Sequence, residues 1–456
     1  MFMTSSFCQR RSASYDWRMH DDKTNRTIST GDRLGFVPIC TLALVISVSV
    51  SQSAAILVSA STISQRSPFN ERRAISLGAR ASDNAQAAIY FMTNDQRGNY
   101  IVAGEVANDG SVTFRQAIAT GGQGMHGNST GADGLYSQGS VQVHNKEGLL
   151  AVVNAGSHTV SLFGIDATNP VNFGLIGTAD SGGEFPNSVA FNKAGSELCV
   201  LNTGKVNGVN CYSVDKRTGL RPLSDTRRSL ELIQTTPATG APFTASQVNY
   251  NEDENKLIVA VKGNQTDQPG FFAVWDKNGD KLSSTFKKIP VPSGGARPFS
   301  LSNIPGKNAV LVADPAVGVE VLDLSSGRPQ ATSINGQQAT CWSVYSAKTG
   351  HFYLVDAAGS MVREASVDDS LHPTIIQQYP LTNNSGPLDS AIATVNGKDY
   401  LYSLAPGTSS VEVLALEGPG AATRVGAFDF AAAAKGSSLH IEANNVQGMA
   451  TYSKQS

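Results

Sequence analysis

Residues 140–166 read SVQVHNKEGLLAVVNAGSHTVSLFGID, and this stretch decides the fold. It holds a short β-rich segment, a polar turn at 145–148, an apolar segment at 149–154, a short loop, and a third β-rich segment that closes on Asp166. Short apolar runs separated by Asn, Gly and Ser turns are typical of antiparallel strands. The stretch therefore predicts three consecutive strands joined by tight connections.

The same pattern recurs along the chain. Residues 188–215 and 247–276 repeat it most closely, and weaker or partial copies begin at residues 88, 299, 342 and 390. The aspartates that close successive copies lie roughly 45 to 60 residues apart, a period typical of propeller blades with four short strands each. We count seven units and predict an all-β, seven-bladed β-propeller over residues 85–456. Residues 439–452 are expected to help close the ring.

Composition excludes several other classes of protein. Of the 456 residues, 40% are hydrophobic and only 16% are charged, and the formal net charge is -2. Such a balance argues against disorder and against a nucleic-acid partner. Long stretches with helical periodicity are missing, which disfavours a helical protein.

The N-terminal region differs from the repeats. Residues 1–33 are polar and mildly basic, and residues 34–60 hold an uncharged apolar run followed by small residues. This order is typical of a secretory signal, and a single membrane anchor is the alternative. Residues 61–84 are interpreted as a propeptide or linker with a dibasic site at Arg72–Arg73. We expect no membrane association after processing.

Four N-x-S/T sequons accompany this leader. They lie at Asn25, Asn128, Asn264 and Asn383, and the last three fall in polar loops where a glycan is tolerated. Together with the leader, they predict a glycoprotein of the extracellular space or cell wall. We expect it to be a monomer.

Beyond the leader, the cysteines are Cys199, Cys211 and Cys341. Pairing Ala151 with Leu162 across the hairpin of the second blade places the equivalent Cys199 opposite Cys211. A disulfide between them and two buried thiols remain open alternatives. No zinc-type spacing is present, and residues 276–280 lack most ligands of a calcium loop, so we expect a hairpin there and no metal.

Propeller geometry predicts where a site can form. The innermost strand of each blade starts on one face, and the loop between the second and third strands opens on the same face. Residues at or near the starts of inner strands are Gln138, Asn187, Gln247, Arg297, Trp342 and Asp389. Residues at the matching loop starts are Asn94, Asn154, Asn202, Lys262, Asp314 and Asp356, a ring that Leu404 interrupts in the seventh blade. These side chains either bind a ligand at the channel mouth or cap local turns.

Four further residue roles can be assigned on this face. Arg297 either binds an anion or packs its stem under Phe299 and donates to a carbonyl. Glu184, His126 and His158 are candidates for an acid or base, with ordinary solvated side chains as the alternative.

Several stretches resemble lactonase-type seven-bladed propellers. They are YFMTN at 90–94, AVVNAGS at 151–157, SQVNY at 246–250, SGGARPF at 293–299 and TCW at 340–342. That family includes bacterial 6-phosphogluconolactonase and the fungal 3-carboxy-cis,cis-muconate cyclase. The resemblance covers roughly residues 85 to 455. It extends to a secreted branch with fungal cell-wall glycoproteins implicated in adhesion and host recognition.

The resemblance implies a cofactor-free reaction on a small carboxylated lactone or muconate. Arg297 would hold a carboxylate, and Glu184, His126 or His158 would move one proton. Catalytic members commonly place His after Pro where an inner strand starts, whereas this chain has Gln138-Gly and Pro186-Asn187. Catalysis is therefore left open. The alternative is a non-catalytic cell-surface glycoprotein whose propeller binds a cell-wall or matrix component.

Overall fold

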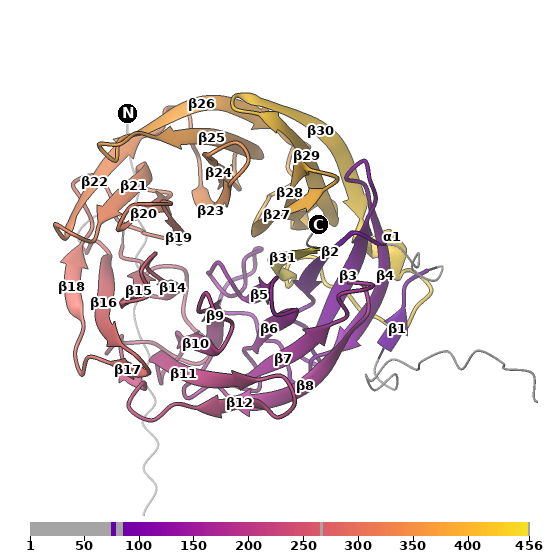
Figure 1. Ribbon diagram of the computed structural model, residues 1–456, viewed down its shortest axis with the longest axis horizontal. Helices are drawn as coiled ribbons and strands as arrows, with labels where there is room; N and C mark the ends of the chain where they lie inside the picture. The colour runs from indigo at the N-terminus through magenta and orange to yellow at the C-terminus, as the bar shows by residue number, and fades with distance from the viewer. Residues whose placement is uncertain (1–73, 79–84, 265–267, 455–456) are drawn as a thin grey trace, which may run out of the picture. The chain divides into compact units, whose positions relative to one another are not determined.

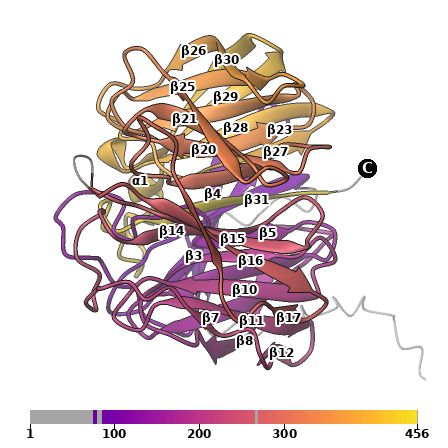
Figure 2. The same ribbon diagram turned by 90° about the vertical axis from the view of Figure 1, so that its left-hand side faces the viewer.

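Seven antiparallel sheets stand in a ring in the computed structural model, which describes residues 74–78, 85–264 and 268–454 (Figure 1). Each sheet is one blade, and successive blades follow the chain around the ring. Seen from the side, the strands of neighbouring blades stack on one another (Figure 2). The predicted seven-bladed β-propeller is confirmed.

Six blades are built from strands that follow one another in the sequence, each listed from the channel outward. The second and third are β5–β8 (Val141–His144, Leu149–Asn154, Thr159–Ile165, Phe173–Asp180) and β9–β12 (Pro186–Phe191, Glu197–Asn202, Gly208–Asp215, Gly219–Pro222), with β13 (Arg228–Ser229) on β11. The fourth and fifth are β14–β17 (Ala245–Tyr250, Lys256–Val261, Phe271–Asn278, Lys281–Leu282), with β18 (Lys287–Pro290) on β16, and β19–β22 (Ser300–Asn303, Ala309–Asp314, Gly318–Asp323, Arg328–Ser333). The sixth and seventh are β23–β26 (Thr340–Ser346, His351–Asp356, Met361–Val367, Pro373–Pro380) and β27–β30 (Ser390–Val395, Lys398–Ala405, Ser410–Gly418, Ala421–Asp429).

The first blade joins the two ends of the described chain. Its order from the channel outward is β31 (Gln447–Ser453), β2 (Ala87–Met92), β3 (Tyr100–Val106), β4 (Val112–Ala119) and β1 (Ala74–Ser76). The C-terminal strand β31 pairs antiparallel with β2 and so closes the ring, as predicted for residues 439–452. Strand β1 pairs with β4, so the sheet extends upstream of the expected start at residue 85. A short helix, α1 (Phe430–Ala434), and a 3-10 turn (Pro406–Thr408) complete the fold.

The core lies between the blades. Strands such as β2, β6 and β10 are buried along their whole length, because the two neighbouring blades together cover both faces of each blade. Tyr90 of the first blade, for example, packs edge-on against Phe173 of the second, with 5.4 Å between ring centroids. Uninterrupted apolar runs in the sequence are explained by this two-sided burial.

The predicted cross-strand cysteine pair is a disulfide. Cys199 of β10 and Cys211 of β11 are register partners, and the two sulfur atoms are bonded. Cys341 is the free cysteine of the part that the structure describes. Residues 276–280 form the expected hairpin, in which Asn278 of β16 pairs with Lys281 of β17.

Residues 1–33 and 34–60, the Arg72–Arg73 pair and the Asn25 sequon lie outside the described residues. Within the described ranges, no helix has both the length and the apolar character needed to cross a membrane.

Candidate active site at the channel mouth

The inner strands define two ends of the central channel. We call the end at which β5, β9, β14, β19, β23, β27 and β31 start the upper end, and the end at which they finish the lower end. The residues placed at inner-strand starts and loop starts by the sequence do lie at these positions, from Asn187 in β9 to Asp389 directly before β27. The upper end therefore brings together side chains from every blade.

Most of the Asn and Asp ring caps backbone rather than facing a ligand. The Asn94 amide exchanges two hydrogen bonds of 3.0 Å with the backbone of Met125. Asn202 accepts from the Ser181 hydroxyl at 2.7 Å and donates to its carbonyl. Asn154 accepts from the Thr120 hydroxyl at 2.6 Å. These amides hold loops in place.

The two aspartates of the ring have the same role in the fifth and sixth blades. Asp314 accepts from the N–H groups of Ala296 and Arg297, both at 2.8 Å, and so orders the segment that carries Arg297. Asp356 accepts from the N–H groups of residues 338 and 339 and forms a buried ion pair with Arg363 at 2.7 Å. These carboxylates shape the upper end without being free for chemistry.

A long connection between β4 and β5, which we call the channel loop (residues 121–139), spans the upper end. Asn187 donates to the Leu135 carbonyl, and the Trp342 indole donates to the Ser137 carbonyl at 3.2 Å. The Gln138 side chain exchanges two 3.0 Å hydrogen bonds with the backbone of Ser343. The loop is thus fixed to the third and sixth blades across the channel.

Lys262 is the exception among the loop-start residues. Its side chain is only 2% exposed, and its Nζ donates to the Tyr136 carbonyl at 2.5 Å and lies 4.8 Å from the centroid of the Phe299 ring. Burial lowers the pKa of Lys262 to about 7, while Asp133 of the channel loop opposes that shift. An amine with such a pKa holds or releases a proton near neutral pH.

Two carboxyl groups share this environment. Burial raises the pKa of Asp133, with Asp389 adding to the effect and Lys262 opposing it. Burial also raises the pKa of Asp389 to about 6. The Gln447 amide bridges them, donating to Asp133 at 3.0 Å and to Asp389 at 2.9 Å. The site therefore couples an acid with a raised pKa to a base with a lowered one.

Arg297 supplies the second cation. Its backbone N–H is bound by Asp314, but its buried Nε has no hydrogen-bond partner among the described residues. Other buried polar atoms at inner-strand starts also lack a partner there, among them Asn187 Oδ1, Thr340 Oγ1 and Gln447 Oε1. Because buried polar groups are normally satisfied, these atoms mark a place for a polar ligand or water.

Cys341 lies beside these groups and keeps part of its surface accessible. Burial raises the pKa of its thiol, and Asp133 adds to the shift. The thiol is therefore protonated at neutral pH and is a poor nucleophile.

The three predicted acid–base residues do not join Arg297. Both ring nitrogens of His126 contact carbonyls of its own loop at 2.8 Å. The carboxylate of Glu184 accepts from the Thr236 hydroxyl at 2.5 Å, and Nδ1 of His158 accepts from the Phe185 N–H at 3.2 Å. In the described ranges, none of the three has a contact with Arg297, so Lys262 and Asp133 are the better candidates for proton transfer.

Sequence reasoning missed Asp133 and Gln447 as site residues. Gln447 occupies the start of β31, the inner strand of the first blade, which the repeat pattern did not assign. Asp133 lies inside the channel loop, where no repeat position predicts its role. Gln247 lies near the start of β14, as predicted, but its side chain exchanges hydrogen bonds with the backbone of Leu301 in the next blade and lines a pocket at the other end of the inner strands.

No family model matches the chain, and no curated protein matches it. Among solved structures, a candidate 6-phosphogluconolactonase from Bacteroides fragilis aligns with a TM-score of 0.53 and 15% identity, over 82% of this chain and 99% of that one. A periplasmic gluconolactonase from Pseudomonas aeruginosa aligns with a TM-score of 0.55 and 14% identity, over 75% and 96%. The fold of this chain is therefore that of the 6-phosphogluconolactonase-like seven-bladed propellers, as the resemblance of its repeats implies.

Proposed function

We propose that this chain is a secreted lactonase-like enzyme that acts at the upper end of its channel on a small carboxylated lactone or muconate. The observation that carries the proposal is the pair of cations Lys262 and Arg297. Lys262 has a pKa of about 7, and the buried Nε of Arg297 has no hydrogen-bond partner in the part of the chain that the structure describes. Solved propellers with this fold that are named as lactonases support the reaction class.

The residues divide the work of lactone hydrolysis. The Arg297 guanidinium holds the substrate carboxylate and fixes its orientation. The neutral Lys262 amine accepts a proton from water as the water oxygen attacks the lactone carbonyl carbon. The bond from that carbon to the ring oxygen then breaks, and the protonated Asp133 or Lys262 supplies the proton to the leaving oxygen. The product is an open hydroxy acid.

Muconate cyclisation needs the same kinds of residue as lactone hydrolysis. A carboxylate oxygen adds to a conjugated alkene, and one proton is delivered to carbon. The reaction again needs a cation for a carboxylate and one acid–base group. Which of the two reactions is preferred depends on the size and shape of the substrate that can bind beside the channel loop.

The test is an assay of the secreted protein on carboxylated, phosphorylated and neutral lactones and on 3-carboxy-cis,cis-muconate. Arg297→Ala should lower kcat/KM on carboxylated substrates at least tenfold and leave neutral lactones less affected, because charge-assisted hydrogen bonds contribute about 1.5–3 kcal/mol. The exposed Arg221→Ala serves as the matched control. Turnover unchanged in Arg297→Ala would contradict this site, and no turnover on any substrate would contradict the enzyme proposal.

One observation favours a non-catalytic alternative, in which the propeller is a binding module of the cell surface. The channel loop bridges the upper end, and the sequon residues Asn128, Asn264 and Asn383 all lie in upper-end connections. Glycans there would surround the mouth and suit contact with a cell-wall or matrix component. Absence of turnover, together with glycan occupancy at these residues and retention on cell-wall material, would favour this alternative.

A further inference from the structure

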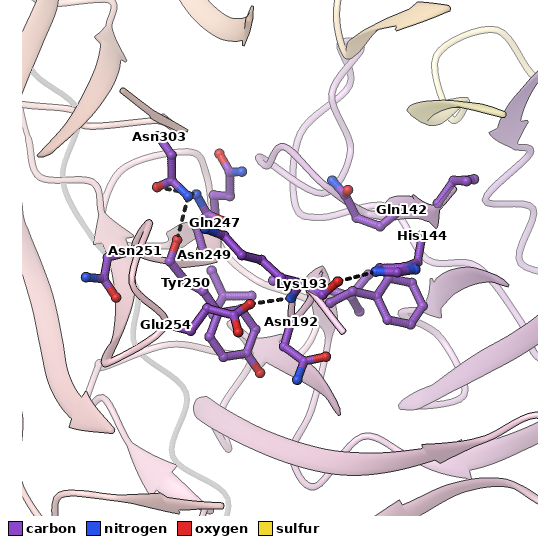
Figure 3. A pocket seen from close by; sticks show the side chains of 15 residues that line it. Gln142, His144, Asn192, Lys193, Gln247, Asn249, Tyr250, Asn251, Glu254 and Asn303 are labelled. Atoms are coloured by element: carbon purple, nitrogen blue, oxygen red, sulfur yellow. Dashed lines mark hydrogen bonds between the residues drawn. The ribbon is translucent and has the colours of Figure 1, made fainter. Parts of the chain in front are cut away.

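A separate pocket lies at the lower end of the channel (Figure 3). It is formed where the inner strands β5, β9, β14 and β19 end and turn toward the next strand, so four consecutive blades contribute to it. Its volume is about 230 Å³. That is room for roughly seven water molecules at about 30 Å³ each.

Neutral amides are the most frequent polar side chains in the wall of the pocket. Gln142, Gln247, Asn249 and Asn303 all contribute to its wall. The Asn249 amide donates at 3.4 Å to the Asn303 side chain and to the Leu301 carbonyl, both long hydrogen bonds. The Gln142 side chain has no hydrogen-bond partner among the described residues, although Gly139 lies close to it. Gln142 and Asn249 are therefore available to an incoming molecule.

The charged groups of the rim are engaged with one another. Lys193 Nζ forms an ion pair with Glu252 at 3.0 Å, and the Lys193 backbone N–H donates to Glu254. His144 Nε2 contacts the Lys193 carbonyl at 3.0 Å, while its Nδ1 accepts from the Glu147 N–H at 3.2 Å, contacts that fit the neutral ring. Among the described residues that line the pocket, Lys193 is the Lys or Arg side chain, and its charge is already paired.

An aromatic side chain completes one wall. The Phe191 ring packs edge-on against His144, with 5.8 Å between ring centroids, and both residues line the pocket. An apolar wall beside a few convergent polar groups is the usual composition of a small-ligand site.

We propose that this lower pocket binds an uncharged, polyhydroxylated ligand of monosaccharide size. Amide groups both donate and accept, as hydroxyl groups do, and no described residue occupies the donors or the acceptor of the Gln142 amide. The volume admits one sugar ring, and the Phe191 side chain, which lines the pocket, offers apolar surface to its C–H groups. This binding lies beyond the proposed catalysis and does not depend on turnover at the upper end.

The test is ligand-observed NMR with the methyl glycosides of glucose, mannose and N-acetylglucosamine, followed by titration of any binder on the full chain. Gln142→Leu keeps the side-chain volume and removes the amide, so affinity should fall about tenfold, the effect of one or two lost hydrogen bonds. Asn249→Ala should weaken the same glycoside. Gln377→Ala, an exposed amide on β26, should leave its affinity unchanged.

Two outcomes would overturn the proposal. One is that no glycoside binds up to its solubility. The other is that binding persists unchanged in both Gln142→Leu and Asn249→Ala while their melting temperatures match that of the parent protein. Arg297→Ala separates this site from the enzyme proposal, since it should reduce turnover and leave glycoside binding intact.

Discussion

The two ends of the channel are framed by the same inner strands but differ in chemistry. The upper end holds Lys262, Arg297, Asp133 and Asp389 and is spanned by the channel loop, whereas the lower end is lined by neutral amides such as Gln142. Sevenfold repetition determines where the strands lie, but it does not determine which side chains occupy their two ends. One repeat architecture can therefore present an acid–base site and a neutral polar pocket on opposite faces.

The difference has a structural cause. Connections between blades open on the upper face, and one long connection, the channel loop, adds Asp133 and the Tyr136 carbonyl to that end. These additions bury Lys262 and shift the pKa of the groups around it. The lower end has only the short turns between neighbouring strands, and its amides join one blade to the next.

The strongest test of the comparison is Lys262→Met. Methionine fills similar volume without a titratable group, so loss of a general base should lower kcat about 10²–10⁴-fold. In the parent protein, kcat should rise with pH through about 7 as Lys262 loses its proton. Lys288→Met is the matched control, because Lys288 also lies over an aromatic ring, Phe271, at 4.3 Å, but on an outer strand. A variant with parental kcat would remove Lys262 from the mechanism.

The second-largest effect is expected from a steric change at Gly295, two residues before Arg297. A Cβ on Gly295 would lie 2.0 Å from Oε1 of Glu320, whose carboxyl is fully buried beside Asp314. Gly295→Ala should therefore cost about 1–3 kcal/mol of stability and raise KM by displacing the segment that carries Arg297. Chemical denaturation and steady-state kinetics measure the two effects. Gly177→Ala, which meets nothing within 4 Å, should change neither.

Removing the opposing carboxyl should relieve the crowding. In the double variant with Glu320→Ala, part of the lost stability should return, giving a coupling between the two sites. Strict additivity of the single changes would mean that Gly295 and Glu320 do not interact as their geometry indicates.

The third test uses the pH dependence of stability. The pKa of Asp389 is about 6 in the folded protein and near 3.9 in an unfolded chain, so the folded state binds more protons between these values. Asp389 thus stabilises the fold at low pH, and its contribution is lost as pH rises from about 4 to 6, at up to about 1.4 kcal/mol per pH unit. Lys262 acts in a more alkaline pH range. Its pKa is about 7 in the folded protein and near 10.4 in an unfolded chain, so its contribution to the free energy of unfolding grows as pH rises from about 7 toward 10.

Urea unfolding across both windows checks these signs. Asp389→Asn should flatten the dependence below pH 6 relative to the parent protein and leave the alkaline window intact. An unchanged acid slope in that variant would show that Asp133 or another carboxyl carries the effect.

The fold was predictable because the sequence repeats. The blade pattern placed Asn187, Lys262 and Arg297 at the upper end, and the register of one hairpin paired Cys199 with Cys211. Each of these inferences needs only local strand order and a known period. The same reasoning located the residues without showing which way their side chains face.

The site itself was less predictable, because it depends on contacts outside the repeat. The charge of Asp133 acts on Lys262 from the channel loop, which is not part of the repeat, and Gln447 belongs to the ring-closing strand. For Asp314, the sequence left ligand binding and turn capping as alternatives, and the structure shows that its carboxylate accepts from backbone N–H groups. His126 faces two carbonyls for the same reason: loop conformation, rather than sequence position, decides its partners.

The smallest expected effects belong to the lower end. Gln142→Leu removes an amide that makes no hydrogen bond within the described residues, so the free energy of unfolding should change by no more than about 0.5 kcal/mol. Lactone turnover should stay at the parental value, since Lys262, Arg297 and Asp133 do not line the pocket that holds this side chain. Denaturation and kinetics on one preparation, beside Gln377→Ala, test both statements. A large loss of stability would mean that Gln142 holds blades together, and a loss of turnover would mean that the two ends are coupled through the inner strands.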